Sequence, residues 1–441
     1  MAKTFKGGLH IDDHKEMTNK TPIRVIDGSK VHVYPLQQHI GAPIEPVVKV
    51  GDTVKVGDII ADNKEAFVCA PLHSSISGTV KKIEPHYHPS GAMVTSIIIE
   101  NDGLYEISDK VTPKDPDKMT PKEIIGIIRD SGIVGMGGAG FPTHVKLSPP
   151  SDKKITHIIV NGAECEPYLT SDHRRMLESP EEVLDGLTIV MKALGLDEGY
   201  IGIELNKPDA ISVMTEIAKK FGNIHIVPLK TKYPQGAEKQ LIYAITKRQV
   251  PSGGLPADAG AIVINIDTVT QISKAFRTGL PLIERIVTVS GDCIKNPCNV
   301  QVRCGMSFDD IINAAGGLIK EPKKIIMGGP MMGIAQFTTD IPVIKTTSAI
   351  IAISDSGDTF DENSPCIRCG KCVEACPMKL APLYLNKFAI ADNLEMAEKY
   401  NIMDCIECGI CSYLCPGMQS PLHNIRVAKQ KIIEKRRKNM Q

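Results

Sequence analysis

The chain has 441 residues, which is enough for about three domains of ordinary size. Its formal net charge is zero, tryptophan is absent and aromatic residues make up 4% of the chain, so nothing favours nucleic acid as a partner. No apolar run approaches the ~20 residues that span a bilayer, and we expect membrane association only through a partner or a surface helix.

Residues 1–112 are predicted to form an all-β domain. The sequence Val48–Asp52 recurs as Val54–Asp58, and Ser75–Ile83 alternates apolar with polar residues, as half-buried strands do. This string resembles the barrel-sandwich fold of biotinyl and lipoyl domains, in which a hairpin lysine can carry a swinging cofactor. Lys64 is the nearby candidate, but no Met-Lys or Asp-Lys pair is present, so an unmodified structural barrel is favoured.

Residues 119–284 show an α/β pattern that begins after a proline-punctuated linker from Pro113 to Pro121. Thr120–Glu123 has the sequence of a capping box that begins a helix, and Gly132 ends that helix. Strand-like runs then alternate with helices, which predicts a largely parallel, Rossmann-like sheet covered on both faces. The predicted strands are Ile155–Val160, Tyr200–Leu205, Ile224–Pro228 and Ala261–Ile266.

Residues 285–335 are predicted to form a compact α+β unit. It has strands at Val287–Ser290 and Lys324–Met327, and a helix that begins at Ser307. We expect residues 335–362 only to connect this unit to the next domain. Three closely spaced cysteines could form a further metal site, but no histidine or carboxylate pattern completes it, so ordinary buried residues are favoured. They are Cys293, Cys298 and Cys304.

Two near-identical cysteine strings dominate residues 358–420, which we expect to form a small ferredoxin-like α domain. Each string has the spacing Cys-x-x-Cys-x-x-Cys-x-x-x-Cys-Pro, which is typical of bacterial proteins that hold two 4Fe-4S clusters. The fourth cysteine of such a string ligates the other cluster, so we predict crossed ligation. One cluster is assigned to Cys366, Cys369, Cys372 and Cys415, and the other to Cys405, Cys408, Cys411 and Cys376.

Two alternatives for these cysteines are weaker. Zinc sites also use Cys-x-x-Cys, but zinc does not require four cysteines per string at this spacing. A disulfide framework does not suit a long chain without a secretory signal.

The residues after the cysteines, 421–441, form a basic tail. A solvated helix end explains the charge, and contact with anionic lipid or an acidic partner is the alternative. The basic residues are Lys429, Lys431, Lys435, Arg436, Arg437 and Lys438.

A glycine-rich loop spans Gly135–Thr143 and satisfies the pattern G-x-G-x-x-G. It does not fit a Rossmann loop, because a helix precedes it and Pro142 interrupts the stretch after it, where a helix should begin. Glycine amides can still approach a phosphate or a flat ring closely. The neighbouring Phe141 and Lys146 suit ring stacking and phosphate pairing, which favours a ligand-binding loop over a flexible surface loop.

Four ordered segments resemble motifs of the NADH-binding flavoprotein subunit of respiratory complex I. The segments are GMGGAGFPTHVK (135–146), VNGAECEP (160–167), YPQGAEKQL (233–241) and VINIDTV (263–269). Residues 286–333 resemble the soluble-ligand-binding β-grasp unit of that family. The barrel, the opening FKGGLH (5–10) and the cysteine strings are absent from the complex I protein, and the combination resembles the C subunit of the Rnf electron-transport complex, a membrane-bound ferredoxin:NAD oxidoreductase.

This resemblance implies a site for FMN and NAD(H). The glycine loop and Lys146 contact FMN, and three polar residues complete the flavin site. Phe141 stacks on the adenine of the nucleotide, and three carboxylates line its pocket. Because carboxylates suit ribose hydroxyls and repel a 2′-phosphate, NAD is expected rather than NADP. The residues are Gly135, Gly137, Gly138, Gly140, Phe141, Lys146, Asn161, Asn265, Thr268, Glu164, Glu166 and Glu238.

Two residues depart from the complex I pattern. Ala163 stands where that flavoprotein has an aspartate near the flavin, and Ala237 stands where it has a glutamate. The geometry of the pocket is therefore expected to differ in detail.

The resemblance also implies a function. We expect an enzyme that converts between the two-electron chemistry of NAD(H) at FMN and the one-electron chemistry of two 4Fe-4S clusters. It would work at the cytoplasmic side of the cell membrane with integral membrane subunits and a ferredoxin-like iron–sulfur subunit, coupled to Na⁺ or H⁺ movement and exchanging electrons indirectly with ferredoxin. Two alternatives are a cobalamin reductase of a bacterial microcompartment and a non-catalytic scaffold.

Overall fold

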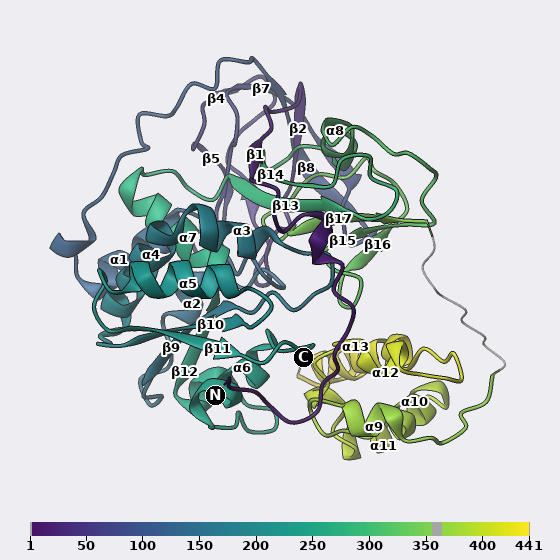
Figure 1. Ribbon diagram of the computed structural model, residues 1–441. Coiled ribbons are helices and arrows are strands. Elements are labelled where there is room, and N and C mark those ends of the chain that lie inside the picture. The colour runs from purple at the N-terminus through teal and green to yellow at the C-terminus, as the bar shows by residue number, and fades with distance from the viewer. Residues whose placement is uncertain (1, 355–363, 441) are drawn as a thin grey trace.

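The computed structural model describes residues 2–354 and 364–440, and Figure 1 shows their path. The amino-terminal barrel consists of two small antiparallel sheets that share one apolar core, in which Tyr34, Ile60 and Ile97 are fully buried. One sheet contains β2 (Val31–Pro35), β8 (Met93–Asn101), β7 (Gly78–Tyr87) and β4 (Thr53–Val54), and the other contains β3 (Glu45–Pro46), β5 (Ile59–Asp62) and β6 (Leu72–His73). Lys64 is exposed in the loop that follows β5.

The second domain is built on a four-stranded sheet in which all strands run parallel, and we call it the α/β domain. The predicted strands are confirmed within two residues at their ends: β11 (Ile224–Leu229), β10 (Gly199–Glu204), β9 (His157–Gly162) and β12 (Ala261–Asn265), in this spatial order. Alternate residues of β9 enter different cores, because Ile158 and Val160 pack on one face and Ile159 on the other. The expected sheet, buried on both faces, is therefore present.

Helices cover the two faces of this sheet unequally (Figure 1). Thr120 forms the expected capping box at the start of the first helix. The larger core lies under α1 (Pro121–Asp130), α3 (Ser171–Glu178), α4 (Pro180–Leu194), α5 (Pro208–Ala218) and α7 (Ile266–Arg277). The smaller one lies under α6 (Glu238–Thr246). Short turns of helix are η2 (Pro116–Lys118), α2 (Thr143–Lys146) and η3 (Pro256–Ala259).

The third domain is a six-stranded mixed sheet with one covering helix, α8 (Phe308–Ala314). Its strand order is β1 (Arg24–Val25), β14 (Cys298–Arg303), β13 (Glu284–Ser290), β17 (Ala349–Ile353), β15 (Lys324–Met327) and β16 (Ile334–Gln336). The expectation that residues 335–362 only connect two domains was wrong for β17. This apolar strand pairs with both β13 and β15 in the middle of the sheet, where its side chains are buried.

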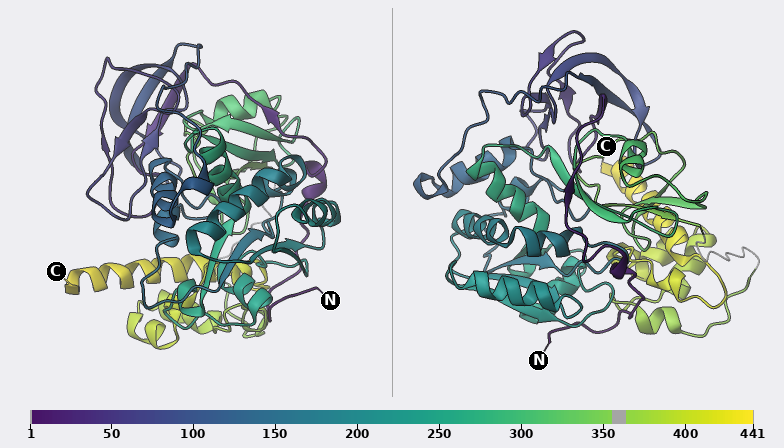
Figure 2. Two further views of the ribbon diagram at one scale, coloured as in Figure 1. Left: turned by 90° about the vertical axis from the view of Figure 1, so that its left-hand side faces the viewer. Right: turned by 45° about the horizontal axis from the view of Figure 1, so that its top comes forward.

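The cysteine strings lie in a small helical domain, which we call the cysteine domain. It contains α9 (Lys371–Ala375), α10 (Pro382–Ile390), α11 (Leu394–Lys399), η4 (Ile402–Asp404), α12 (Ile410–Tyr413) and α13 (Pro421–Met440). The expected basic tail is the helix α13. Its residues Ile425, Ala428 and Ile432 are buried in the core of this domain, and its end projects outward (Figure 2).

The barrel and the cysteine domain lie at opposite ends of the molecule (Figure 1). Within the predicted barrel domain, residues 1–112, the first barrel strand is β2, and the residues before it take another path. The chain starts beside the α/β domain, passes the cysteine domain, forms η1 (Lys15–Met17) and reaches the mixed sheet at β1 before it enters the barrel (Figure 1 and Figure 2). No helix in the described residues is long and apolar enough to cross a bilayer.

Candidate functional site

The glycine-rich loop lies between α1 and α2, as the sequence predicts, and not between a strand and a helix. It is fastened to the first turn of α7, which directly follows β12, because the amide of Met136 donates to the Thr268 hydroxyl at 3.0 Å. A Cβ atom on Gly137 would lie 2.7 Å from the side-chain nitrogen of Asn265. Glycine therefore allows the loop to lie directly on the end of the sheet.

A cavity of about 520 Å³ opens at this end of the sheet. Its size is in the range of small-molecule sites, and the carboxyl ends of parallel strands are the usual place for a nucleotide. All the residues predicted to bind FMN and NAD(H) line it: Gly135, Gly137, Gly138, Gly140, Phe141, Lys146, Asn161, Glu164, Glu166, Glu238, Asn265 and Thr268. The structure thus brings four distant segments into one site with room for such cofactors.

Two asparagines fix the floor of the cavity. Asn161 and Asn265 are partners in register at the ends of β9 and β12. The Asn161 amide group donates to the carbonyl of Gly236 at 2.8 Å, and that of Asn265 donates to the Asp172 carboxylate at 2.7 Å. Each side chain therefore ties a neighbouring loop or helix to the sheet.

Lys146 and Glu238 form one wall of the cavity. The Lys146 ammonium group donates to Glu238 at 2.7 Å and to the carbonyl of Val263 at 2.9 Å. The lysine is thus held at the cavity, where it suits a phosphate, and its charge is partly balanced by the carboxylate. Phe141 is 36% exposed beside it, so its ring is available for stacking.

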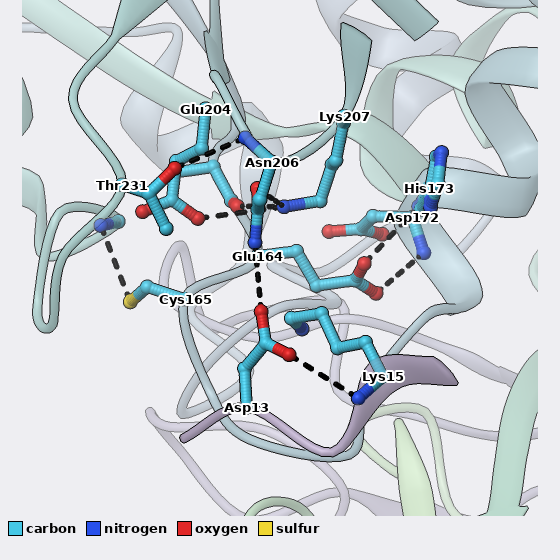
Figure 3. Close-up of polar contacts among 12 residues, drawn as sticks. Asp13, Lys15, Glu164, Cys165, Asp172, His173, Glu204, Asn206, Lys207 and Thr231 are labelled. Carbon is cyan, nitrogen blue, oxygen red and sulfur yellow. Dashed lines mark hydrogen bonds and ion pairs between the residues drawn. The ribbon is translucent and has the colours of Figure 1, made fainter. Parts of the chain in front are cut away.

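Glu164 caps the helix α3 from inside the cavity (Figure 3). Its carboxylate accepts hydrogen bonds from the amides of Asp172 at 2.7 Å and His173 at 3.2 Å. A carboxylate at a helix N-terminus satisfies amides that have no partner within the helix. The predicted contact with a nucleotide ribose would have to share this carboxylate with the helix.

Asp172 is a site residue that the sequence analysis missed. It lines the cavity and is half-buried. Burial raises the pKa of its carboxyl well above the ordinary value, and the nearby Glu164 and Asp267 carboxylates raise it further. The surroundings at the cavity floor thus shift this group toward its protonated form.

Glu166 lies where the cavity meets the cysteine domain. Burial raises the pKa of its carboxyl group to about 7. Its oxygens lie 3.1 Å from the amide of Met331 and 3.3 Å from the hydroxyl of Tyr233. The Tyr233 hydroxyl has one proton and a shorter contact, 2.8 Å, to the carbonyl of Cys408, so a protonated Glu166 can donate to the phenol oxygen.

The eight cysteines line two adjoining cavities in the cysteine domain. The first is lined by Cys366, Cys369, Cys372 and Cys415, and the second by Cys376, Cys405, Cys408 and Cys411; Cys372 and Cys411 lie on the wall that both share. This grouping fits the predicted crossed ligation. Gly370 and Gly409 each have a φ near +80° at the same turn of the two strings, where glycine is favoured.

Sulfurs set around a cavity suit the corners of an iron–sulfur cluster, and both cysteine cavities have this arrangement.

The second cysteine cavity is the one that adjoins the cofactor cavity. Ile406, between two of its cysteines, lines both cavities. Tyr233 lies in the cofactor cavity and bonds the backbone of Cys408. Tyr233 lies in one of the segments that resemble the complex I flavoprotein, but the sequence does not indicate this contact, and an isoleucine between cysteine ligands carries no signal either.

The five remaining cysteines have ordinary surroundings. Cys69, Cys293, Cys298 and Cys304 are buried, and the last three show no arrangement for a metal ion in the part of the chain that the structure describes. Cys165 lies in the cofactor cavity, where its sulfur accepts a hydrogen bond from the amide of Gly236 at 3.3 Å. Burial raises the pKa of this thiol, which disfavours the reactive thiolate.

Four family models match the chain in the expected order. Residues 3–104 match an RnfC barrel sandwich hybrid domain, and residues 128–274 match a Nuo51 FMN-binding domain. Residues 286–335 match an SLBB domain, and residues 365–419 match a 4Fe-4S dicluster domain. The fold and the two kinds of site therefore define a redox protein with FMN and two 4Fe-4S clusters.

Curated relatives specify the family. The C subunit of the Na(+)-translocating ferredoxin:NAD(+) oxidoreductase complex of Acetobacterium woodii is 47% identical over 99% of this chain and 98% of its own length. The corresponding subunit of a proton-translocating complex of Clostridium ljungdahlii is 48% identical over 92% of this chain and 88% of its own. The chain belongs to the family formed by the C subunits of ion-translocating ferredoxin:NAD(+) oxidoreductase complexes, as the motifs predicted.

A solved structure shares the fold at greater distance. An NAD⁺-reducing NiFe-hydrogenase in the H₂-reduced state matches with a TM-score of 0.51 at 16% identity. The match covers 71% of this chain and 61% of the hydrogenase chain. At this identity the likeness concerns the fold alone.

Proposed function

We propose that this chain is the NAD(H)-reactive subunit of a membrane-bound ferredoxin:NAD oxidoreductase that moves Na⁺ or H⁺. The observation that carries the proposal is the junction between the two kinds of cavity. All the predicted FMN and NAD(H) residues line one cavity, and Ile406 and Tyr233 form its boundary with the second cysteine cavity. A two-electron site and a one-electron site thus meet without an intervening domain.

The residues of the cofactor cavity have distinct tasks in this proposal. When bound, FMN supplies hydride exchange with NAD(H) and one-electron exchange with iron–sulfur clusters. The glycine loop presents backbone amides to it, and Lys146 offers a positive charge to its phosphate. Phe141 is available for the adenine ring. The carboxylates of Glu164 and Glu238 disfavour a 2′-phosphate, which supports NAD as the nucleotide.

The residues between the cavities keep the redox sites close and dry. Tyr233 and Ile410 are buried, and both belong to an apolar cluster with Cys408 and Ile406. Water is thereby excluded from the boundary, and the backbone of the second string is held by the Tyr233 hydroxyl. We assign the cluster in the second cysteine cavity to the position nearer the flavin. The cluster in the first cysteine cavity is then the one nearer the partner.

The first string is suited to passing electrons onward. Cys366 and Cys369 are exposed, so a cluster held there would lie near the surface of the protein. The partners proposed are integral membrane subunits and a ferredoxin-like iron–sulfur subunit, with the chain peripheral at the cytoplasmic side of the membrane. The names of its relatives, which are subunits of ion-translocating complexes, support this assignment.

The test uses the full chain, reconstituted with iron, sulfide and FMN under anaerobic conditions. NADH is added, and the absorbance of flavin and clusters is followed together with the electron paramagnetic resonance (EPR) signal of reduced clusters. The proposal predicts that NADH bleaches the flavin and then reduces the clusters, and that NADPH does so far less well. A protein that carries all three groups but is not reduced by NADH would refute the proposal.

A further inference from the structure

The segment Lys3–Lys15, which we call the strap, has no role in the function described so far. It contains the sequence FKGGLH and precedes the barrel in the chain, yet it lies between the α/β domain and the cysteine domain (Figure 1). Its path crosses the boundary between these two domains, close to the place where the cofactor cavity adjoins the second cysteine cavity. Its contacts on both sides suggest what it does.

On one side, the strap extends the edge of the parallel sheet. Lys3 forms a parallel bridge to Leu229 of the edge strand β11. The Lys232 ammonium group lies 3.9 Å from the centroid of the Phe5 ring and donates to the carbonyls of Phe5 and Gly7, both at 2.7 Å. Phe5 itself is 5% exposed, so this end of the strap is firmly seated.

On the other side, the strap is bonded to the second cluster site. The amide of Gly8 donates to the carbonyl of Ala375, which precedes Cys376, at 2.9 Å. Leu9 and Tyr233 exchange two backbone hydrogen bonds, of 2.8 and 2.7 Å. Two adjacent residues of the strap thus join the residue before Cys376 to the tyrosine that bonds Cys408.

Glycine is required at both of the central positions. Gly7 and Gly8 have φ values of +82° and +78°, which disfavour residues with a side chain. A Cβ atom on Gly7 would lie 2.8 Å from the carbonyl oxygen of Cys376, and one on Gly8 would lie 2.6 Å from that of Tyr233. Both obstacles are backbone atoms, so a side chain here must push the two domains apart.

The far end of the strap, with Asp13 and Lys15, lies close to Glu164 of the cofactor cavity (Figure 3). Lys15 is 5% exposed, and its ammonium group donates to the carbonyl of Glu166 at 2.9 Å and also to that of Leu169. The carbonyl of Asp13 accepts from the amide of Tyr168 at 2.7 Å. The strap therefore holds the loop that carries Glu164 and Glu166 as well as the boundary with the cysteine domain.

We propose that the strap fixes the second cluster site at its distance from the flavin site, with Gly7 and Gly8 as its positioning residues. This inference rests on the proposed function. Electron transfer between two centres slows steeply as their separation grows, so a small displacement of Cys376 and Tyr233 should matter more for that transfer than for the binding of either cofactor.

The experiment compares three variants of the full chain. Gly7→Ala and Gly8→Ala place a methyl group against the backbone of Cys376 and Tyr233. Gly91→Ala is the matched control, because Gly91 has a φ of +87° but no atom within 4 Å of its added Cβ. All three variants carry similar backbone strain, and only the first two press on the boundary. Lys232→Met, which removes the anchor of the strap without a glycine change, serves if the glycine variants do not fold.

The first readout does not depend on activity. Hydrogen exchange is measured at the amides of Leu9 and Tyr233, whose reciprocal bonds join the strap to the α/β domain. Gly8→Ala should lose protection at both amides relative to Gly91→Ala, while protection in β9 and β10 stays unchanged. The second readout separates the two halves of the reaction by stopped flow, with iron and FMN contents measured first.

With NADH as reductant, flavin reduction in Gly8→Ala should keep the rate of the control, while cluster reduction should slow by about tenfold to a hundredfold. Equal exchange and equal cluster reduction in Gly8→Ala and Gly91→Ala would overturn the role of the strap. So would loss of cofactor in place of slower transfer. If NADH reduces no flavin even in Gly91→Ala, the proposed function fails, and the electron-transfer role of the strap fails with it.

Discussion

The two cysteine strings have almost the same sequence but very different surroundings. Cys366 and Cys369 of the first string are exposed, whereas Cys408 of the second is 8% exposed. The first string has Arg368 and Lys371 at the positions where the second has Glu407 and Ile410. Ile410 is buried against Tyr233, and Glu407 pairs with Arg426 and Lys429 of α13.

This difference shows how a duplicated motif becomes directional. The cysteines set which metal group is held, and the residues between them set which way each copy faces. Ile367 is 64% exposed, while Ile406 at the corresponding position lines the cofactor cavity. The second string faces the α/β domain, and we call the cluster site of its cavity the inner site. The first string faces solvent, and we call the cluster site of its cavity the outer site.

The largest effect is expected from replacing single cysteines of the inner and outer sites. Cys376→Ser lies in the first string but should destroy the inner cluster, since Cys376 lines the cavity of the second string. NADH should then still bleach the flavin, and reduction of the outer cluster should be abolished. Cys415→Ser should instead remove the outer cluster and leave the inner one reducible.

Iron analysis and EPR spectroscopy of the two serine variants check this prediction. Each variant should keep about half of the iron of a chain with two 4Fe-4S clusters. Cys298→Ser, a buried cysteine in the mixed sheet, is the control and should keep all of it. If Cys376→Ser instead removes the cluster that carries the signature of the outer site, ligation is not crossed.

A smaller effect, a difference in the rate of iron release from the two sites, is expected when the intact protein is treated with a chelator and a mild oxidant. The exposed Cys366 and Cys369 leave the outer site open, while the inner one is shielded by the α/β domain. About half of the iron should be released in an early phase, with EPR spectra showing the inner cluster that remains. Release of both halves at one rate would mean that the two sites are equally accessible in solution.

A further effect concerns Glu166, the buried carboxylate where the cofactor cavity meets the cysteine domain. Burial raises the pKa of Glu166 from 4.5 to about 7, so the stability it contributes is fully present below about pH 4.5 and is lost as the pH rises through about 7. Glu166→Gln keeps an acceptor without the charge. It should leave stability unchanged at about pH 4 and raise it by about 3 kcal/mol at about pH 8.

Unfolding of the wild-type and Glu166→Gln chains across this pH range measures the difference. Glu181→Gln, an exposed carboxylate in the first turn of α4, is the control and should show no such trend. A Glu166→Gln variant that loses stability equally at both ends of the range would show that the carboxylate acts only as a hydrogen-bond acceptor.

Much of the site could be predicted because its parts depend on local sequence. The strands of the α/β domain are apolar runs bounded by helices, and Asn161 and Asn265 stand at the strand ends where a parallel sheet binds ligands. The glycine loop and the cysteine spacing likewise indicate their chemistry within a few residues. For these elements, no knowledge of distant contacts was needed.

The remainder depends on contacts between distant segments. The strap has no hydrophobic period, and its two glycines acquire meaning only beside Cys376 and Tyr233. β17 is a five-residue apolar run that could equally be a buried connection. The helix-capping contact of Glu164 could not be predicted for the same reason, since only the fold places the start of α3 beside its carboxylate.

The smallest effect is expected from two lysines of α13 that differ in their distance from the inner string. The Lys429 ammonium group donates to the carbonyl of Cys405 at 2.8 Å and to Glu407 at 2.5 Å, and its side chain is 14% exposed. Lys431 forms an ion pair of 2.7 Å with Asp392 at a surface where both side chains are largely exposed. Lys429→Ala should therefore lower the free energy of unfolding of the cysteine domain by about 1–2 kcal/mol, and Lys431→Ala by less than about 0.5 kcal/mol. Thermal unfolding of the cluster-loaded chains measures both changes. Equal effects would mean that the contacts of Lys429 with the second string stabilise the domain no more than the exposed ion pair of Lys431 does.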